Sequence, residues 1–551
     1  MFADVARTTF GVDGSGVTVG VLSDSFDCLG TAVFDLVTGD VPADLGILME
    51  GPDCAAATDE GRAMMQIVHD VAPGARQLFH TAFTGQAGFA QGIRALAAAG
   101  ARVIVDDVLY FAEPMFQDGV IAQAVDDVAA MGVSFFSAAG NSGALSYAAP
   151  FAPSGQIFSG GALHDFVPGA GVDVTQRVTL PVGLSVITLQ WRNNFYSLNG
   201  APGAASDLDL VLLNGAGNQI LAVSSDSNVG GDPVEVLGFF NPGPSTGFNL
   251  AISRFSPPGT DPGRLQYVIS NGALDEYDSA SGTLYGHANA AGAEAVGAAP
   301  YYLTPGFGVD PAFAEPFSAR GGTPILFDPA GQPIHEVRHK PEIVCPDGGN
   351  TTFFGSDVDF DGFPNFFGTS AAAPHAAGIA ALLLELDPDL SPAEINTALE
   401  STAGDMYLAG FDFDTGYGFC LADQALASLG LTDACTDDPG NGVVCLYTGR
   451  FEFTMTWTDG DDMVHPVVFE KYSHQAAVGA FDDADDPAIL VKVTDESCPG
   501  GSWSMWIGGA SSSGGWELEI RDSETGQVES YTPPAGEPTP TTLDSRSFPC
   551  S

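Results

Sequence analysis

The residues best suited to covalent chemistry surround Ser370, in the segment FGTSAAAPHAAG from Phe367 to Gly378. A serine at the start of a helix gains from the helix dipole and from free N–H groups, which favour an anion that develops there. Small neighbours let a substrate backbone approach, and Pro374 in the first helical turn lacks an N–H that would go unused. Taken alone, the pattern also fits an ordinary helix N-cap, so a nucleophile and a structural serine both remain open.

The segment around Ser370 resembles the nucleophile motif GTSxAxPHxxG of the subtilisin-like serine peptidases. This resemblance implies that Ser370 is the nucleophile. Further blocks resemble the same family and occur in its order, among them FSARG and KPEIVCPDG within residues 317–348. Together the blocks cover most of residues 10–165 and 283–430, so the resemblance implies a subtilisin-like domain over both stretches.

Two of these blocks imply further site residues. VTVGVLSDSFD resembles the family's first strand with its catalytic acid, which corresponds to Asp24, with Asp27 as the weaker alternative. Ser23 stands one residue before the expected acid. AAGNSG resembles the oxyanion-hole block, and the resemblance implies that the amide donor is Asn141.

The general base departs from the family pattern. Where the family has His-Gly at the start of a helix, this chain has Glu60-Gly61, in DEGRAMMQIVHDVAPGA. The related sedolisins share the fold and use Ser, Glu and Asp, and counting back from Ala-Pro-Gly-Ala also assigns their catalytic Glu to Glu60. Their partner Asp would fall on Met64 and is missing. The resemblance therefore implies a sedolisin-like variant with a Ser370/Glu60/Asp24 triad and Asn141 as oxyanion donor.

A carboxylate that acts as general base determines the pH range in which the enzyme is active. Attack by a serine needs a base within hydrogen-bond reach, and Glu60 accepts a proton only while it is ionised. The ordinary pKa of glutamate is about 4.3, and a nearby carboxylate such as Asp24 raises it and titrates together with it. We therefore expect a preference for acidic pH.

Three histidines offer alternative bases. His69 lies nine residues further along the helix of Glu60, about 13 Å away by helical rise. His80 lies in a predicted strand, and His375 lies on the helix of the nucleophile itself. A conventional His-dependent subtilase and a catalytically inactive binding or adhesion module remain the two alternatives to an acid-acting peptidase.

Two adjacent carboxylates, Asp106 and Asp107, interrupt the apolar run ARVIVDDVLY. By the resemblance this stretch borders the substrate cleft. One of the two carboxylates either faces Glu60 or binds a substrate amine, and a simple capping acid at the end of the strand is the structural alternative.

Two groups of aspartates suggest calcium, which prefers many oxygen ligands. Asp357, Asp359 and Asp361 alternate around a glycine turn in DVDFDGFPN, without the glutamate of an EF-hand. A second group resembles the region where sedolisins bind calcium after the nucleophile helix; it comprises Asp405, Asp412 and Asp414. A polar turn is the alternative for the first group.

The elements that position these residues alternate between strand and helix. Short apolar runs separated by amphipathic helices predict an α/β fold with a doubly wound parallel sheet in residues 1–165 and 283–431. Seven strand-like runs with turn residues between them predict an inserted β-sandwich at residues 166–282. Residues 432–551 are expected to form a C-terminal β domain.

The amino-acid composition limits the classes of binding partner and the cellular compartment that fit this protein. The 551 residues carry 69 acidic and 17 basic side chains, a net charge of −52, which excludes a nucleic-acid binder and a polybasic membrane contact. No stretch reads as a membrane-spanning helix. Eight cysteines are typical of a secreted protein; they fall into the groups Cys28 and Cys54; Cys345 and Cys420; and Cys435, Cys445, Cys498 and Cys550.

The sequence therefore predicts a secreted, monomeric serine endopeptidase that hydrolyses extended polypeptides. A folded strand pattern follows Met1 almost at once, so we expect the signal peptide and any pro-segment to be missing from this sequence.

Overall fold

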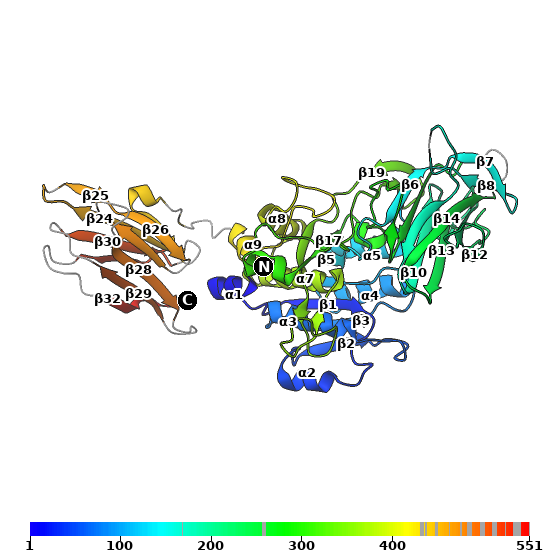
Figure 1. Cartoon of the computed structure of the whole chain (residues 1–551). Helices are drawn as coiled ribbons and strands as arrows, with labels where there is room; N and C mark the ends of the chain where they lie inside the picture. Colours follow the sequence, from blue (N-terminus) through cyan, green and yellow to red (C-terminus); the bar gives the residue numbers. More distant parts are fainter. Residues whose placement is uncertain are drawn as a thin grey trace. The chain divides into compact units, whose positions relative to one another are not determined.

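The computed structural model consists of two compact units, Met1–Ala425 and Leu426–Ser551 (Figure 1). The structure describes all residues except 168, 256–259, 430–434, 436–437, 447–449, 462, 474–475, 482–486, 496–501, 510–514, 524, 533–541 and 550–551.

The first unit is built on a seven-stranded parallel sheet with the strand order β2-β3-β1-β4-β5-β17-β20. Its inner strands are short runs of buried residues, as expected for a parallel sheet covered on both faces. This confirms the expected α/β fold. The strands are β1 (Thr18–Ser23), β2 (Leu45–Met49), β3 (Arg76–Thr81), β4 (Val103–Asp106), β5 (Ser134–Ala138), β17 (Ala293–Pro300) and β20 (Ile343–Asp347).

Helices cover both faces of this sheet. The main ones are α3 (Glu60–Val71), α4 (Gln86–Ala98), α5 (Val120–Ala130) and α7 (Thr369–Leu386). α4 and α5 pack on one face, where Leu22 of β1 joins Phe89 of α4 in the core. α3 and α7 pack against each other on the opposite face, where a Cβ at Gly61 of α3 would contact the side chain of Ser23. The sheet is therefore doubly wound.

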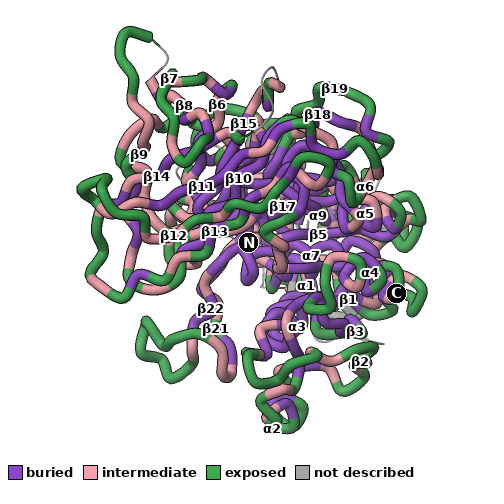
Figure 2. Tube along the Cα trace, turned by 90° about the vertical axis from the view of Figure 1, so that its right-hand side faces the viewer, coloured by how far each residue is buried: buried purple, intermediate pink, exposed green. Residues whose placement is uncertain are grey.

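Helix α7 is the central element of the first unit and is mostly buried (Figure 2). It contacts β1, β4, β5, β17 and β20. Among the described residues it is the one helix long and apolar enough to cross a membrane by length and composition, and 83% of that window is buried inside the fold. Its apolar character is therefore accounted for by packing in the core.

The inserted β-sandwich begins at Ser146, earlier than residue 166. β6 (Ser146–Pro150) already pairs with the sandwich strand β15, and β8 (Gly161–His164) pairs with β14. The two sheets are β13-β10-β15-β6 and a seven-stranded sheet that contains β12-β11-β14-β8-β7, β9 and β16. The remaining strands are β7 (Pro153–Phe158), β9 (Gln176–Leu180), β10 (Gly183–Trp191), β11 (Leu208–Leu213), β12 (Ile220–Ser224), β13 (Val234–Asn241), β14 (Thr246–Arg254), β15 (Arg264–Ile269) and β16 (Ala273–Leu274).

The second unit contains two antiparallel sheets around one apolar core. β24 shows the alternation of buried and half-buried residues expected when one face of a strand meets the core. The strands are β23 (Val443–Leu446), β24 (Phe451–Thr458), β25 (Val464–Pro466), β26 (Val468–Ser473), β27 (Ala476–Ala480), β28 (Pro487–Asp495), β29 (Ser502–Gly509), β30 (Trp516–Asp522), β31 (Val528–Tyr531) and β32 (Thr542–Pro549).

Shorter elements complete the chain. The helix α8 starts with a capping box in which Ser391 and Glu394 bond each other's backbone N–H groups. The short helices are α1 (Ala3–Phe10), α2 (Ala32–Thr38), α6 (Tyr196–Asn199), α8 (Pro392–Thr402), α9 (Ala422–Ser428), η1 (Gly286–Asn289), η2 (Tyr301–Leu303), η3 (Pro305–Phe307) and η4 (Pro439–Asn441). The short strands are β18 (Ile325–Phe327), β19 (Pro333–Glu336), β21 (Gly349–Asn350) and β22 (Asn365–Phe366).

Three disulfides follow the grouping of the cysteines along the sequence. Cys28 bonds Cys54 and Cys345 bonds Cys420 in the first unit, and Cys435 bonds Cys445 in the second. Cys498 and Cys550 lie outside the described residues.

Candidate active site

Ser370 lies in the first turn of α7, at the carboxyl edge of the parallel sheet. Gly368, the residue before α7, has a φ of 129°, which side-chain-bearing residues rarely adopt. Its N–H donates to the Asp347 carboxylate at the end of β20, at 2.8 Å. Ser370 is 8% exposed, so a largely buried hydroxyl is fixed at the start of a buried helix.

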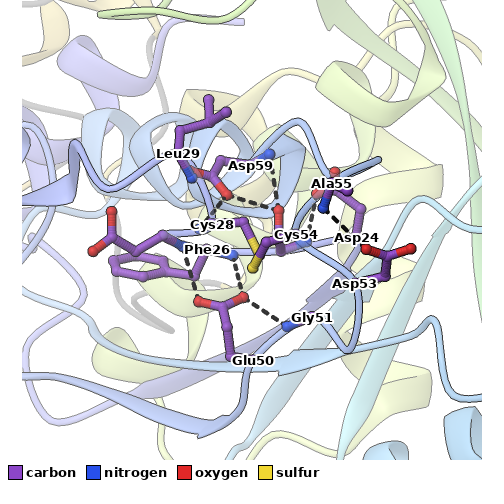
Figure 3. Close-up of a disulfide and its surroundings, with 12 residues drawn as sticks. Asp24, Phe26, Cys28, Leu29, Glu50, Gly51, Asp53, Cys54, Ala55 and Asp59 are labelled. Carbon is purple, nitrogen blue, oxygen red and sulfur yellow. Dashed lines mark hydrogen bonds between the residues drawn. A yellow bond between two sulfur atoms is a disulfide. The ribbon is translucent and has the colours of Figure 1, made fainter.

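Glu60 is the first residue of α3, and the turn before it is held rigidly. Asp59 has a φ of 56°, and its carboxylate accepts the N–H groups of Cys28 at 2.8 Å and Leu29 at 3.0 Å, next to the Cys28–Cys54 disulfide (Figure 3). This network sets the direction in which α3 begins, and with it the location of the Glu60 side chain.

Several groups determine the protonation of Glu60. Burial raises its pKa above the ordinary value, and the negative charge of Asp24 adds to that rise. Side-chain hydrogen bonds with Asp107 and Ser370 act in the opposite direction. The structure therefore brings Glu60 and Ser370 together, although they belong to different helices.

Asp24 lies directly after β1, but its carboxylate is engaged by the loop before α3. One oxygen accepts the N–H of Thr58 at 2.6 Å and the Thr58 hydroxyl at 2.7 Å. The other accepts the N–H groups of Ser25 at 2.5 Å and Gly61 at 3.4 Å. Within the described part of the chain Asp24 forms no hydrogen bond with Glu60 and acts on it through charge.

The two adjacent aspartates at the end of β4 have different surroundings. Asp106 is buried and contacts His287, and Asp107 faces Glu60. Burial and the charge of Glu60 raise the pKa of Asp107 well above its ordinary value. The structure contains a capping contact as well, because Asp106 Oδ1 accepts the N–H of Val108 at 3.2 Å, while Asp107 is the aspartate that neighbours Glu60.

His287 is a feature that the sequence analysis missed. It lies in η1, where Nε2 is 2.9 Å from Asp106 and Nδ1 is 2.9 Å from Glu113. Burial opposes a charge on this ring, but the two carboxylates outweigh it and raise the pKa of His287 to about 10. The one signal in the sequence was a carboxylate in an apolar strand, which requires a buried partner somewhere in the fold.

The three histidines weighed as alternative bases lie elsewhere. His69 is at the end of α3, and burial lowers its pKa. His80 contacts the carbonyl of Thr81 at 2.8 Å. His375 donates from Nδ1 to the carbonyl of Ala371 at 2.8 Å, and burial lowers its pKa to about 4. No hydrogen bond joins any of them to Ser370 in the described part of the structure.

Asn141 lies beside the nucleophile and has a fixed orientation. Its Oδ1 accepts both the N–H of Thr369, at 3.0 Å, and the Thr369 hydroxyl, at 2.9 Å. Because an N–H group requires an acceptor, this contact turns the Nδ2 amide away from Thr369. A Cβ on Gly368 would lie 3.5 Å from Nδ2, so the amide donor lies next to the turn that carries Ser370.

The two groups of aspartates considered for calcium differ in how closely their carboxylate oxygens approach one another. The carboxylate oxygens of Asp357, Asp359 and Asp361 all lie within 4.8 Å of one another on the surface. Three convergent carboxylates fit a hard cation such as calcium. The second group, Asp405, Asp412 and Asp414, is not such a cluster among the described residues. Its carboxylates bond neighbouring backbone N–H groups or, for Asp414, lie 3.4 Å from Arg320.

Comparison with known proteins identifies the family of this chain. Residues 80–418, more than half of the chain, match the family described as subtilase family. Fervidolysin from Fervidobacterium pennivorans is 34% identical over 108 residues, which are 20% of this chain and 14% of that protein. The halolysin-like extracellular serine protease Nep from Natrialba magadii is 39% identical over 101 residues, 18% of this chain and 16% of that protein.

Similarity to solved structures is weaker. The Clostridium perfringens CspB protease superposes with a TM-score of 0.49 at 15% identity, over 78% of this chain and 97% of that one. The matched segments span about a seventh of the length of the two curated relatives. With the family match over residues 80–418, the chain belongs to the subtilase family of serine peptidases.

Proposed function

We propose that this protein is a secreted serine endopeptidase that cleaves extended polypeptides with Ser370 as nucleophile and Glu60 as general base. The observation that carries the proposal is the contact between the Glu60 carboxyl and the Ser370 hydroxyl at the start of α7. In this geometry the most basic group beside the hydroxyl is a carboxylate, and His80, His287 and His375 are engaged elsewhere.

The proposed reaction accounts for each proton that moves and for each bond that forms or breaks. Ser370 Oγ attacks the carbonyl carbon of the substrate while Glu60 accepts the hydroxyl proton. The negative charge that develops on the carbonyl oxygen receives a hydrogen bond from Asn141 Nδ2. Glu60 then returns the proton to the leaving amine, the C–N bond breaks, and an acyl-enzyme remains on Ser370. Water repeats the sequence, with Glu60 as its base, and releases the carboxylic acid.

The pKa of Glu60 determines the acidic limit of activity. Burial raises this pKa, so Glu60 is protonated, and unable to accept a proton, at pH values where an exposed glutamate is already ionised. Activity therefore falls as pH decreases through the raised pKa. Because the hydrogen bonds to Asp107 and Ser370 limit that rise, we propose an optimum in mildly acidic solution.

The compartment and partners follow from the same features. The disulfides and the extracellular relative support secretion. A net charge of −52 disfavours nucleic acid as a partner and keeps molecules apart, which supports a monomer. Extended polypeptides, whose backbone can pair with strand edges beside the cleft, are the proposed substrates.

The experiment that tests this function combines cleavage with labelling. The protein is incubated with denatured casein from pH 3 to pH 9, and in parallel with a fluorophosphonate probe followed by peptide mass spectrometry. We expect casein fragments below pH 6 and a label on Ser370. Absence of both at every pH would favour the inactive binding module, because a nucleophile without an effective base does not react.

A variant of Asn141 tests the oxyanion donor. Asn141→Asp retains the acceptor for Thr369 but, while ionised, offers no donor to the substrate oxygen. We expect kcat to fall about 10²–10³-fold near neutral pH, with KM little changed, and the loss to shrink at low pH, where the aspartic acid is protonated and donates. An unchanged kcat near neutral pH would remove Asn141 from the mechanism.

Calcium binding is proposed at Asp357, Asp359 and Asp361, with a structural role. We expect calcium at about 100 times its Kd to raise the free energy of unfolding by about 2.7 kcal/mol in the wild type. Asp359→Asn is expected to lose this effect, whereas Asp405→Asn, in the group that does not converge, retains it. Thermal unfolding with calcium or with a chelator provides the measurement, and equal behaviour of both variants would contradict the site.

A further inference from the structure

We propose that Asp107, the residue directly after β4, is the acid that shares a proton with Glu60 and positions it for Ser370, and that Asp24 does not have this role. The inference rests on the proposed function, because it names the partner of the proposed base. It differs from the expected Ser370/Glu60/Asp24 triad in the strand that supplies the acid.

The register of the sheet directs Asp107 toward α3. β1 and β4 are parallel neighbours with Val21 opposite Val105 and Leu22 opposite Asp106, where the pairing ends. The same register continued by one residue sets Asp107 beside Ser23, whose hydroxyl faces the Asp107 carboxyl. Laterally paired residues project from the same face of a sheet. The Ser23 side chain lies 3.1 Å from where a Cβ on Gly61 would be. Ser23 and Asp107 therefore both point to the first turn of α3, where Glu60 lies.

The preceding pair in the same two strands points to the other face. Leu22 packs in the core with α4 and α5. Asp106 contacts His287, whose ring lies against Phe89 of α4. This alternation gives the two adjacent aspartates separate environments, and only Asp107 lies on the side of the nucleophile.

The Asp24 carboxylate is engaged by groups other than Glu60. Its two oxygens accept three backbone N–H groups and one hydroxyl, from Ser25, Thr58 and Gly61. Its negative charge raises the pKa of Glu60, but none of its hydrogen bonds among the described residues is with Glu60.

The Asp107 carboxyl differs from that of Asp24 in its hydrogen bonding. Its Oδ1 is shut off from solvent and, among the described residues, has no well-aligned hydrogen-bond partner. The polar groups that face this carboxyl are the Ser23 hydroxyl and Glu60. Two carboxyl groups that touch and are largely shielded from water do not both ionise, so the pair holds one proton. The proton is assigned to Asp107, because its Oδ1 is shut off from solvent and burial and the charge of Glu60 raise its pKa well above the ordinary value.

The other charged groups around the pair fit this assignment. Asp24 lies across the loop before α3 and raises the pKa of Glu60. Asp106 adds negative charge on the side of Asp107, and His287, between Asp106 and Glu113, compensates for it. His287 also holds the chain on both sides of Asp107, from Asp106 to Glu113, so it fixes the end of β4.

Variants of Asp107 and Asp24 are expected to shift the pH profile in opposite directions. Asp107→Ala deprives the half-buried Glu60 of its donor, so the acid limb of kcat/KM should move up by about one pH unit and kcat should fall about 10–10²-fold. Asp107→Asn retains a donor and should restore both to near wild type. Asp24→Asn removes a repelling charge, so its acid limb should move to lower pH.

The measurement is kcat/KM against pH for the whole protein with a casein-derived peptide, after thermal unfolding has confirmed that each variant is folded. An upward shift for Asp107→Ala with rescue by Asp107→Asn supports the inference. An unmoved limb for Asp107→Ala overturns it, as does an upward or absent shift for Asp24→Asn, which can be measured independently of the Asp107 variants. Cleavage by the wild type that does not depend on Ser370 would instead overturn the proposed function.

Discussion

Glu60→Gln is expected to lower kcat/KM about 10⁴-fold at every pH between 3 and 9. Glutamine has nearly the same size as glutamate and can still accept a hydrogen bond from Ser370, but it does not take up the hydroxyl proton at these pH values. General base catalysis contributes about 10²–10⁴-fold, and residues that act as a unit with the nucleophile lose more than this when one is removed. The measurement is steady-state cleavage of denatured casein by wild type and variant.

The matched control for this variant is Glu385→Gln. Glu385 lies at the far end of α7, where its carboxylate accepts the N–H groups of Asp13 at 2.7 Å and Ser15 at 3.1 Å. We expect this substitution to lower the melting temperature and to leave kcat/KM unchanged. Activity of Glu60→Gln with an acid limb near pH 6.5–7 would contradict a carboxylate base and indicate a histidine.

Ser370→Ala is expected to abolish peptide hydrolysis, with kcat reduced about 10⁵–10⁶-fold. The loss is chemical, because alanine fits the space of the serine side chain, in a residue that is 8% exposed. Substrate binding should persist, so an inactive complex with a casein-derived peptide should form and be measurable by calorimetry.

Ser391→Ala provides the contrast to the nucleophile variant. Ser391 is the capping serine of α8, and its loss should cost about 1 kcal/mol of stability without affecting kcat. If Ser370→Ala lowered stability and retained cleavage, Ser370 would be a structural cap of the kind that the motif alone left open.

Local sequence patterns predicted most of the fold. Short apolar runs separated by amphipathic segments located β1, β3, β4 and β5 because a parallel sheet buries both of its faces. The start of the insert was predicted at residue 166 because β6, β7 and β8 are short and only partly buried. Their pairing with β14 and β15 depends on contacts that no local pattern records.

The location of the acid that partners Glu60 shows a further limit of prediction from the sequence. Ser23 and Asp24 are neighbours in the sequence, and a step of one residue along a strand changes the face to which a side chain points. The block VTVGVLSDSFD therefore predicted an acid after β1 but not the direction of its carboxylate. Likewise, the contacts of His287 with Asp106 and Glu113 join residues that are 181 and 174 positions apart in the sequence.

The central claim is that a carboxylate, and not an imidazole, accepts the proton of Ser370. The most direct test is the acid limb of kcat/KM for the wild type, measured at a low and a high temperature, because this limb reports the ionisation of the free enzyme. Carboxyl groups ionise with little enthalpy change, whereas imidazolium groups release their proton more readily on warming. The account predicts a limb that keeps its position, and a limb that moves clearly to lower pH on warming would contradict it.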